Sequence, residues 1–189
     1  DPKDVKCANQ NVYFWKLFEA ALQSRMFIGL RRIFDDGRDT FNIHKFLNYC
    51  KEKINLFSRR ELKIRRLSDP NAHEWIDEFI NDAYEPSVDD FNEFGKLVRN
   101  NSRRIKKVYT PVASKIYAHA IHTDKDQISA ALSDLNFDEI ESALNAVWHV
   151  YNQVWQIYEN GKKPDFKIQP YPYADEINEA VLRQLRALA

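Results

Sequence analysis

Hydrophobic residues recur along most of the chain at the three-, four- and seven-residue spacings that place side chains on one side of an α-helix. The first such stripe, within residues 9–34, consists of Trp15, Phe18, Leu22, Ile28 and Ile33. The second, within residues 43–56, directs inward Ile43, Phe46, Leu47, Cys50 and Ile54. Gly37 lies in the polar stretch between them, where a left-handed residue suits a chain reversal. The pattern therefore predicts two amphipathic helices joined by a turn.

Helix-start signals divide the middle of the chain. Ser58 and Glu61 have the spacing of a capping box, which predicts a short basic helix that ends near Leu67. Asp69 and Pro70 predict a further start, because an acidic N-cap is followed by a proline in the first turn. Short helices with short connections are therefore expected in this region.

A longer helix opens at a second capping box, formed by Ser87 and Asp90, and extends to about residue 108. Its predicted apolar side consists of Val88, Phe91, Phe94, Leu97 and Val98. Thr110 and Pro111 are a typical N-cap and first helical residue, so a separate helix of about three turns is expected next. A further short helix is predicted over residues 126–135.

Asn136 and Glu139 begin the last long helix, and Gly161 ends it. Its aromatic residues recur at helical spacing, which predicts that they lie in the core or in a dimer interface. They are Trp148, Tyr151, Trp155 and Tyr158. A linker with three prolines follows, and an amphipathic helix from Ala174 onward is expected to pack on the body or on a partner.

The elements together predict an all-α fold with a helical domain over residues 1–165 and a linker and amphipathic helix over residues 166–189. Four glycines and seven prolines in 189 residues agree with long helices and short connections. Two cysteines without C-x-x-C spacing are typical of a reducing compartment, and no apolar run has the length of a membrane span. We therefore expect a cytoplasmic protein without a membrane partner.

The 28 basic and 28 acidic residues cancel, which argues against binding of nucleic acid over the whole surface. Two local basic clusters remain, at residues 59–66 and 96–107. Charge runs of this kind are usually solvated helix faces. The second cluster leads directly toward two histidines, so it alternatively predicts contacts to RNA phosphates. The candidate phosphate-binding residues are Arg99, Arg103, Arg104, Lys107 and Tyr117.

The histidines lie in "SKIYAHAIHTD", residues 114–124. Lys115, His119 and His122 are spaced four and then three residues apart, which places them on one side of a helix. Imidazoles can transfer protons and an ammonium group can hold a phosphate, as metal-free RNA cleavage requires. These three are the candidate catalytic residues. The competing interpretation is a solvated helix face.

A metal site is a third interpretation of the same stretch, with Asp124 and Asp126 completing a partial ligand shell. No second histidine motif supplies the remaining ligands, so we expect neither a metal nor another cofactor. The other histidines, His44, His73 and His149, are isolated in ordinary amphipathic segments. We interpret them as structural residues.

Two stretches carry a resemblance to a known family: "LRRIFDDGRDTFNIHKFLNYC", residues 30–50, and "SKIYAHAIHTD". Over residues 9–160 the chain resembles the HEPN superfamily of helical nucleotide- and RNA-associated domains, and within it the U-type abortive-infection branch. The resemblance implies a HEPN-like bundle with a four- to five-helix core and extra short helices. It also implies a homodimer, a role in phage defence or toxin–antitoxin systems, and RNA, a nucleotide or an antitoxin as partner.

Active members of the superfamily resemble metal-independent endoribonucleases. Their motif is an arginine, commonly followed by a polar residue, with four to six residues between that arginine and a histidine. His119 matches the histidine, but the three positions for its arginine hold Val112, Ala113 and Ser114. Counted from His122, Lys115 stands at a permitted position and lacks the planar fork of arginine. The chain is therefore either an endoribonuclease-like enzyme or a catalytically inactive binding and dimerisation module.

Overall fold

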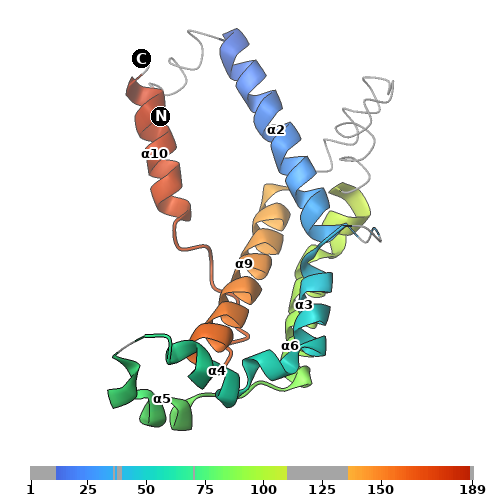
Figure 1. Cartoon of the computed structure of the whole chain (residues 1–189). Helices are drawn as coiled ribbons and strands as arrows, with labels where there is room; N and C mark the ends of the chain where they lie inside the picture. The colour runs from blue at the N-terminus through green and yellow to red at the C-terminus, as the bar shows by residue number, and fades with distance from the viewer. Residues whose placement is uncertain (1–11, 36, 38–39, 70, 110–135, 188–189) are drawn as a thin grey trace.

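In the computed structural model we describe residues 12–35, 37, 40–69, 71–109 and 136–187. Every regular element in these ranges is helical (Figure 1), which confirms the all-α prediction. The elements are α2 (Val12–Phe34), α3 (Ile43–Glu52), η1 (Ile54–Phe57), α4 (Arg59–Arg66), η2 (Ala72–Glu74), α5 (Ile76–Asp82), α6 (Val88–Arg104), η3 (Ile105–Tyr109), α9 (Phe137–Asn160) and α10 (Ala174–Ala187). The helices predicted from Thr110 onward and over 126–135 lie outside the described residues. None of the described helices has the length and apolar character that a membrane crossing needs.

The predicted capping residues lie where their helices begin and end. The Ser58 hydroxyl accepts from the Glu61 amide at 3.3 Å, and the Asp90 carboxylate accepts from the Ser87 amide at 2.8 Å. The Asn136 side chain accepts from the amide of Asp138 at the start of α9. Gly161 ends that helix with a φ of 56°, in the left-handed region. These helix boundaries are set by local sequence, as expected from capping chemistry.

Helix α6 is the centre of the fold, because it packs on α9 along one side and on α3 along another. Its buried residues are Phe91, Phe94, Gly95, Val98 and Ser102. Across the core, α9 contributes Ala143, Val150, Val154 and Ile157. Val88, on the predicted apolar side, is not part of the core, because its side chain is 45% exposed at the start of α6.

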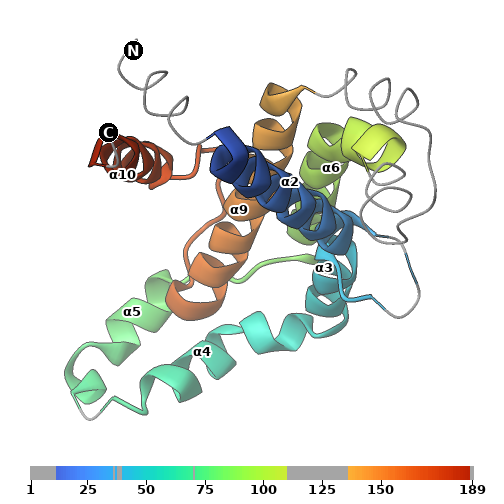
Figure 2. The ribbon, with the colours of Figure 1, turned by 90° about the horizontal axis from the view of Figure 1, so that it is seen from above.

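Helix α2 joins the core only through its C-terminal half, where Phe27, Leu30 and Phe34 are buried. The first half of the predicted stripe is not buried, since Phe18 and Leu22 are exposed. Figures 1 and 2 show the reason, because the N-terminal half of α2 extends beyond the body and away from α3 and α6. The apolar pattern formed a helix as predicted, but no described element covers its first three turns.

The aromatic stripe of α9 also lies largely outside the core. Tyr151 and Trp155 are each 49% exposed, so neither lies in the core and only the dimer-interface alternative of the prediction stays open for both. Tyr158 is half-buried, and its ring packs edge-on against Phe57 at 5.7 Å between centroids. The buried side of α9 instead carries small and β-branched residues, which allow α6 to approach closely.

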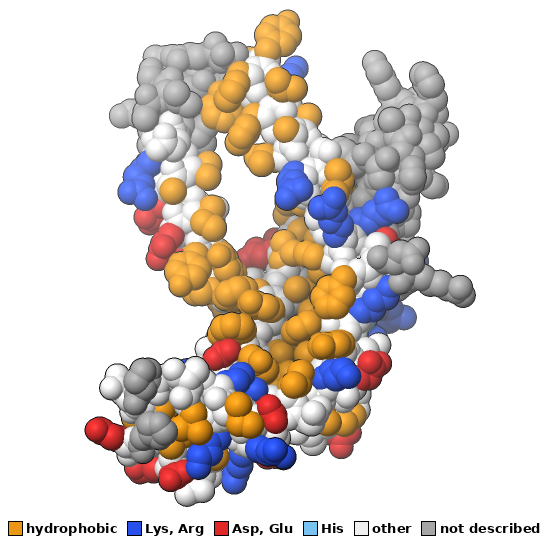
Figure 3. Space-filling model, in the orientation of Figure 1, with side chains coloured by type: hydrophobic (Ala, Val, Ile, Leu, Met, Phe, Trp, Pro, Cys, Tyr) orange, Lys and Arg blue, Asp and Glu red, His pale blue; other side chains and the backbone are white. Residues whose placement is uncertain are grey.

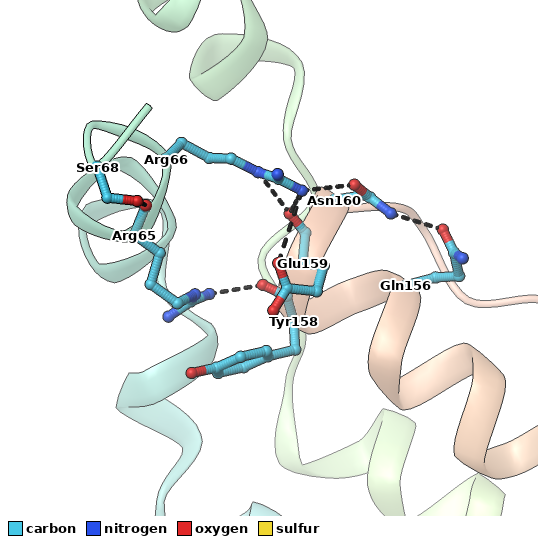
Figure 4. Close-up of polar contacts among 7 residues, drawn as sticks. All are labelled: Arg65, Arg66, Ser68, Gln156, Tyr158, Glu159 and Asn160. Carbon is cyan, nitrogen blue, oxygen red and sulfur yellow. Dashed lines mark hydrogen bonds and ion pairs between the residues drawn. The ribbon is translucent and has the colours of Figure 1, made fainter. Parts of the chain in front are cut away.

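Two arginines of the first basic cluster are structural. Arg65 donates to the carbonyl of Tyr158 at 2.6 Å and lies over the Tyr158 ring at 3.8 Å (Figure 4). Arg66 donates to the carbonyl of Glu159 at 3.0 Å and to the side chain of Asn160 at 2.7 Å. Cations at a helix C-terminus satisfy its last carbonyls and complement its dipole. The pair therefore attaches α4 to the end of α9.

The chain after Gly161 returns along α9 and is attached to it by side chains. His149 is buried, with Nε2 2.8 Å from the carbonyl of Asp165, while its Nδ1 accepts from the amide of Gln169 at 3.4 Å. This pattern requires the proton on Nε2. His149 is thus a structural residue, as predicted. The domain boundary at residue 165 stays a prediction.

Substitution of Gly161 tests the packing of α4 on α9. A Cβ at this position would lie 2.6 Å from the Ala83 side chain and 2.8 Å from that of Leu62, in addition to the strain of a positive φ. We expect Gly161→Ala to lower the free energy of unfolding by about 2 kcal/mol or more. Gly29→Ala is the matched control, because nothing lies within 4 Å of its added Cβ inside α2. It should raise stability by up to about 1 kcal/mol, because alanine favours the helix. Urea unfolding measures both, and equal effects would contradict the account.

Candidate phosphate-binding site

A polar pocket of about 280 Å³ lies between α3 on one side and α6 with η3 on the other. We call it the α3–α6 pocket. Its lining consists of His44, Leu47, Asn48, Lys51, Phe91, Asn92, Gly95, Arg99 and Lys106. Leu47 and Phe91 belong to the hydrophobic core, so the apolar contact between the two helices also forms the floor of the pocket.

Helical spacing explains how each wall is formed. On α3, His44, Asn48 and Lys51 follow one another at four- and three-residue intervals, which places them on one side of the helix. Asn42 caps this helix and accepts from the Lys45 amide at 2.9 Å. His44 therefore lies in the first turn of a helix whose start is fixed by its own cap.

The facing wall follows the same rule over a longer distance. Asn92, Gly95 and Arg99 are spaced three and four residues apart on α6, and Lys106 lies seven residues further along, in η3. The two walls meet at Lys51, whose ammonium group is 3.5 Å from the Asn92 side-chain oxygen. A core helix contact thus brings two separate polar stripes together.

The pocket is electropositive. Lys51, Arg99 and Lys106 supply three cations and His44 adds an imidazole, while none of the described residues that line the pocket is acidic. The side-chain amides of Asn48 and Asn92 add hydrogen-bonding groups. Converging cations and amide donors in a concave site bind anions, and phosphate best matches a guanidinium group beside ammonium groups. The arrangement is therefore suited to a phosphate group.

Gly95 makes room for the arginine. A Cβ built on Gly95 would lie 3.2 Å from a terminal nitrogen of Arg99, so the guanidinium group folds back over the glycine. A glycine within a helix costs about 1 kcal/mol relative to alanine. Its side-chain-free surface here lets the charged group lie close to the α6 backbone at the edge of the pocket.

Of the predicted phosphate-binding residues, the structure places only Arg99 in this pocket. Arg104 instead forms an ion pair with Glu139 at 2.9 Å, which attaches the end of α6 to α9. Arg103 and Lys107 are exposed and do not line the pocket. The remaining predicted site residues lie outside the described residues: Lys115, Tyr117, His119 and His122. Their roles stay predictions.

The contact around Arg104 is structural. Tyr109 is fully buried and donates to the carbonyl of Asn136 at 2.8 Å, while the Asn136 amide donates to the Tyr109 oxygen at 2.7 Å. Burial raises the pKa of the Tyr109 hydroxyl, which keeps the donor protonated. The end of η3 and the start of α9 are thereby held together beside the ion pair of Arg104 and Glu139.

No cluster of three or more histidine, cysteine, aspartate or glutamate side chains suited to a metal occurs within the described ranges. The ligand set of the metal interpretation, His119, His122, Asp124 and Asp126, lies outside them. The α3–α6 pocket itself offers nitrogen cations and amides, which repel or only weakly bind a metal ion. Its chemistry is that of an anion site.

A comparison with known protein families shows the family to which this chain belongs. A family model described as AbiU2 (HEPN_AbiU2) matches residues 4–180. The chain belongs to the AbiU2 family of HEPN proteins. The family accounts for the helical bundle and for the abortive-infection type of protein that the resemblance indicates. No curated protein and no solved structure matches the chain.

For an AbiU2 HEPN protein, one match to the superfamily motif escaped the sequence reasoning. Arg38 is followed by the polar residue Asp39, and five residues separate Arg38 from His44 in "RDTFNIH". His44, interpreted above as a structural residue, thus ends a motif with the arginine that His119 and His122 lack. The spacing was visible in the sequence. Arg38 and Asp39 lie outside the described residues, whereas His44 lines the basic pocket.

Arg99 provides the first test of the pocket. We expect Arg99→Gln to weaken binding of a non-cleavable 2′-O-methyl RNA oligonucleotide, measured by fluorescence anisotropy at several salt concentrations. Loss of one phosphate contact on a single strand should reduce the slope of log K against log salt by about 0.7. Lys96→Gln is the control, because Lys96 is on the same helix but is paired with Glu93 outside the pocket. Equal changes in both variants would contradict a phosphate site at Arg99.

Proposed function

We propose that the protein is a metal-independent endoribonuclease of the abortive-infection type, with its active site at the α3–α6 pocket. One observation carries the proposal: the histidine that ends an R-x5-H motif, His44, lies in the wall of a pocket lined by Lys51, Arg99 and Lys106. Motif and basic pocket are independent features, because one comes from local spacing and the other from helix packing. Arg38 supplies the arginine that the histidines of residues 114–124 lack.

The chemistry needs only groups of this kind. The 2′-oxygen of a ribose forms a bond to the adjacent phosphorus while the bond from phosphorus to the 5′-oxygen breaks. A proton leaves the 2′-hydroxyl and a proton is added to the 5′-oxygen; His44 transfers one of them and solvent water transfers the other. Lys51 and Arg99 hold the non-bridging oxygens and stabilise the charge of the pentavalent transition state. The products are a 2′,3′-cyclic phosphate and a 5′-hydroxyl.

The wider proposal includes partners. A homodimer with RNA as substrate, controlled by an antitoxin, is the arrangement that the HEPN resemblance implies. Lys115, Tyr117, His119 and His122 keep their proposed role as a second set of substrate-facing groups on the segment that follows η3. The inactive binding module was favoured by a missing arginine. Arg38 provides an arginine at the motif spacing, so the missing arginine no longer argues for an inactive module. Inactivity is instead one of the possible results of the cleavage assay.

Cleavage in excess EDTA tests the proposal directly. We expect the wild type to cut a mixed RNA pool and leave 2′,3′-cyclic phosphate ends, and we expect His44→Gln to lower the rate roughly 10²- to 10⁴-fold because a general acid–base group is lost. Lys63→Gln is the control, since Lys63 pairs with Asp77 on the distant α4–α5 unit. Thermal unfolding confirms that each variant is folded.

The same assay separates the two candidate histidines. If His119→Ala abolishes cleavage while His44→Gln leaves it unchanged, the active site lies on residues 114–124. If the wild type binds RNA without cutting it at high protein excess, the inactive binding module is correct.

A further inference from the structure

A large apolar groove lies on another face of the molecule, bounded by α2, α3, α9 and α10. Its volume of about 1040 Å³ is at the upper limit of small-molecule sites, which measure roughly 300–1,000 Å³. Its base includes Ile33, Phe46, Leu144 and Trp148. Figure 3 shows this hollow as a continuous area of hydrophobic side chains between two projecting helices. We call it the apolar groove.

Both projecting helices carry exposed apolar side chains. On the N-terminal half of α2, Tyr13, Leu17 and Leu22 are 89%, 73% and 54% exposed. On α10, Ile177 and Val181 are each 52% exposed. In Figure 3 the hydrophobic side chains of α10 lie on the side that faces α2. We call these two helical segments, residues 12–24 and 174–184, the arms.

No other described element covers the exposed apolar side chains of the arms. A short helix is marginal in water unless an apolar side packs against something, and contiguous exposed apolar surface marks an interaction site. The aromatic side chains of the groove, among them Trp148 and Tyr151, are of the types enriched at protein interfaces. A macromolecular surface, and not a small ligand, therefore fits the size and shape of this face.

The charged residues of the arms limit the kinds of partner that can bind them. Residues 12–24 hold one lysine and one glutamate, and α10 mixes both signs within Asp175, Glu176, Glu179 and Arg183. An anionic membrane would require a basic polar face, and a strongly charged protein would require the opposite charge. Neither is present on the described arms. The α2 arm is neutral, and the acidic residues of the α10 arm outnumber its single arginine, which further disfavours an anionic membrane. The groove lining is mainly apolar, so it complements the exposed apolar side chains of the arms.

We infer that the groove binds the arms of a second copy of this chain, in a two-fold dimer in which each copy inserts an arm into the groove of the other. A two-fold interface requires a self-complementary surface, and the described residues include both an apolar groove and exposed apolar helices beside it. Insertion of an arm into the partner's groove therefore covers both the apolar groove and the exposed side chains of the arm. The inference deepens the homodimer of the proposed function by assigning its surface.

The dimer surface and the pocket share helix α3. Ile43 and Phe46 line the groove, whereas His44 and Lys51 line the α3–α6 pocket. A second copy in the groove therefore contacts the first turn of the helix that carries His44. Dimerisation holds the first turn of α3 in place beside the α3–α6 pocket, while the cations of the pocket come from the same chain.

Light scattering after size exclusion tests the oligomeric state. We expect a mass of twice the 22.4 kDa of one chain. Leu17→Glu with Leu22→Glu should give a folded monomer, because both side chains are exposed and the charges are incompatible with an apolar groove. Ile64→Glu, an equally exposed position on α4, is the control and should stay dimeric. A monomeric wild type at all concentrations, or a dimeric double variant, overturns the inference.

Mixed disulfide formation tests the arrangement. In a Cys7→Ser background, one preparation carries Leu17→Cys and the other Leu144→Cys, and the mixture is oxidised. Cys50 does not interfere, because burial raises its pKa to about 11. We expect a covalent dimer in the mixture and none when Ile64→Cys replaces Leu144→Cys. Absence of the specific crosslink overturns the arm-in-groove arrangement. RNA cleavage, measured on the same samples, reports separately on the proposed function: a crosslinked dimer without cleavage contradicts only the latter.

Discussion

The packing of α6 against both α9 and α3 is the contact on which the rest of the structure depends. Phe91 lies in the core and also forms the floor of the α3–α6 pocket, so one side chain contributes to stability and to the site. Small residues on the buried side of α9, such as Ala143 and Ala146, let α6 approach closely. Because α6 is held in place by the core, the cations on its outer side are presented from a rigid element, which favours an ordered anion site.

Local signals in the sequence predicted most helix boundaries. Ser58, Ser87, Asn136 and Gly161 act within one turn of their own positions, so their effects do not depend on the fold. Burial was harder to predict, because it depends on which neighbours arrive. The first half of α2 and the aromatic stripe of α9 have helical periodicity, yet Leu22, Tyr151 and Trp155 are exposed within the described chain.

The candidate site shows the same division between local and tertiary information. The R-x5-H spacing of Arg38 and His44 is local and was available from the sequence. The pocket was not, because Lys51 and Arg99 lie 48 residues apart and meet only through packing of α3 on α6. The basic cluster at residues 96–107 was predicted to be either a solvated helix face or a set of RNA contacts. In the structure Arg99 lines the pocket, while Arg104 pairs with Glu139 in the scaffold.

The central claim is that RNA phosphate binds beside His44. Nitrogen-15 NMR of the five histidine side chains, recorded during titration with 2′-O-methyl RNA, tests it most directly. The account predicts that the His44 imidazole signals shift on binding and that Arg99→Gln reduces this shift at equal RNA concentration. The signals of His149, which is hydrogen-bonded to the backbone on the other side of the core, should stay in place. A response confined to His119 and His122, with His44 unchanged, would contradict the account.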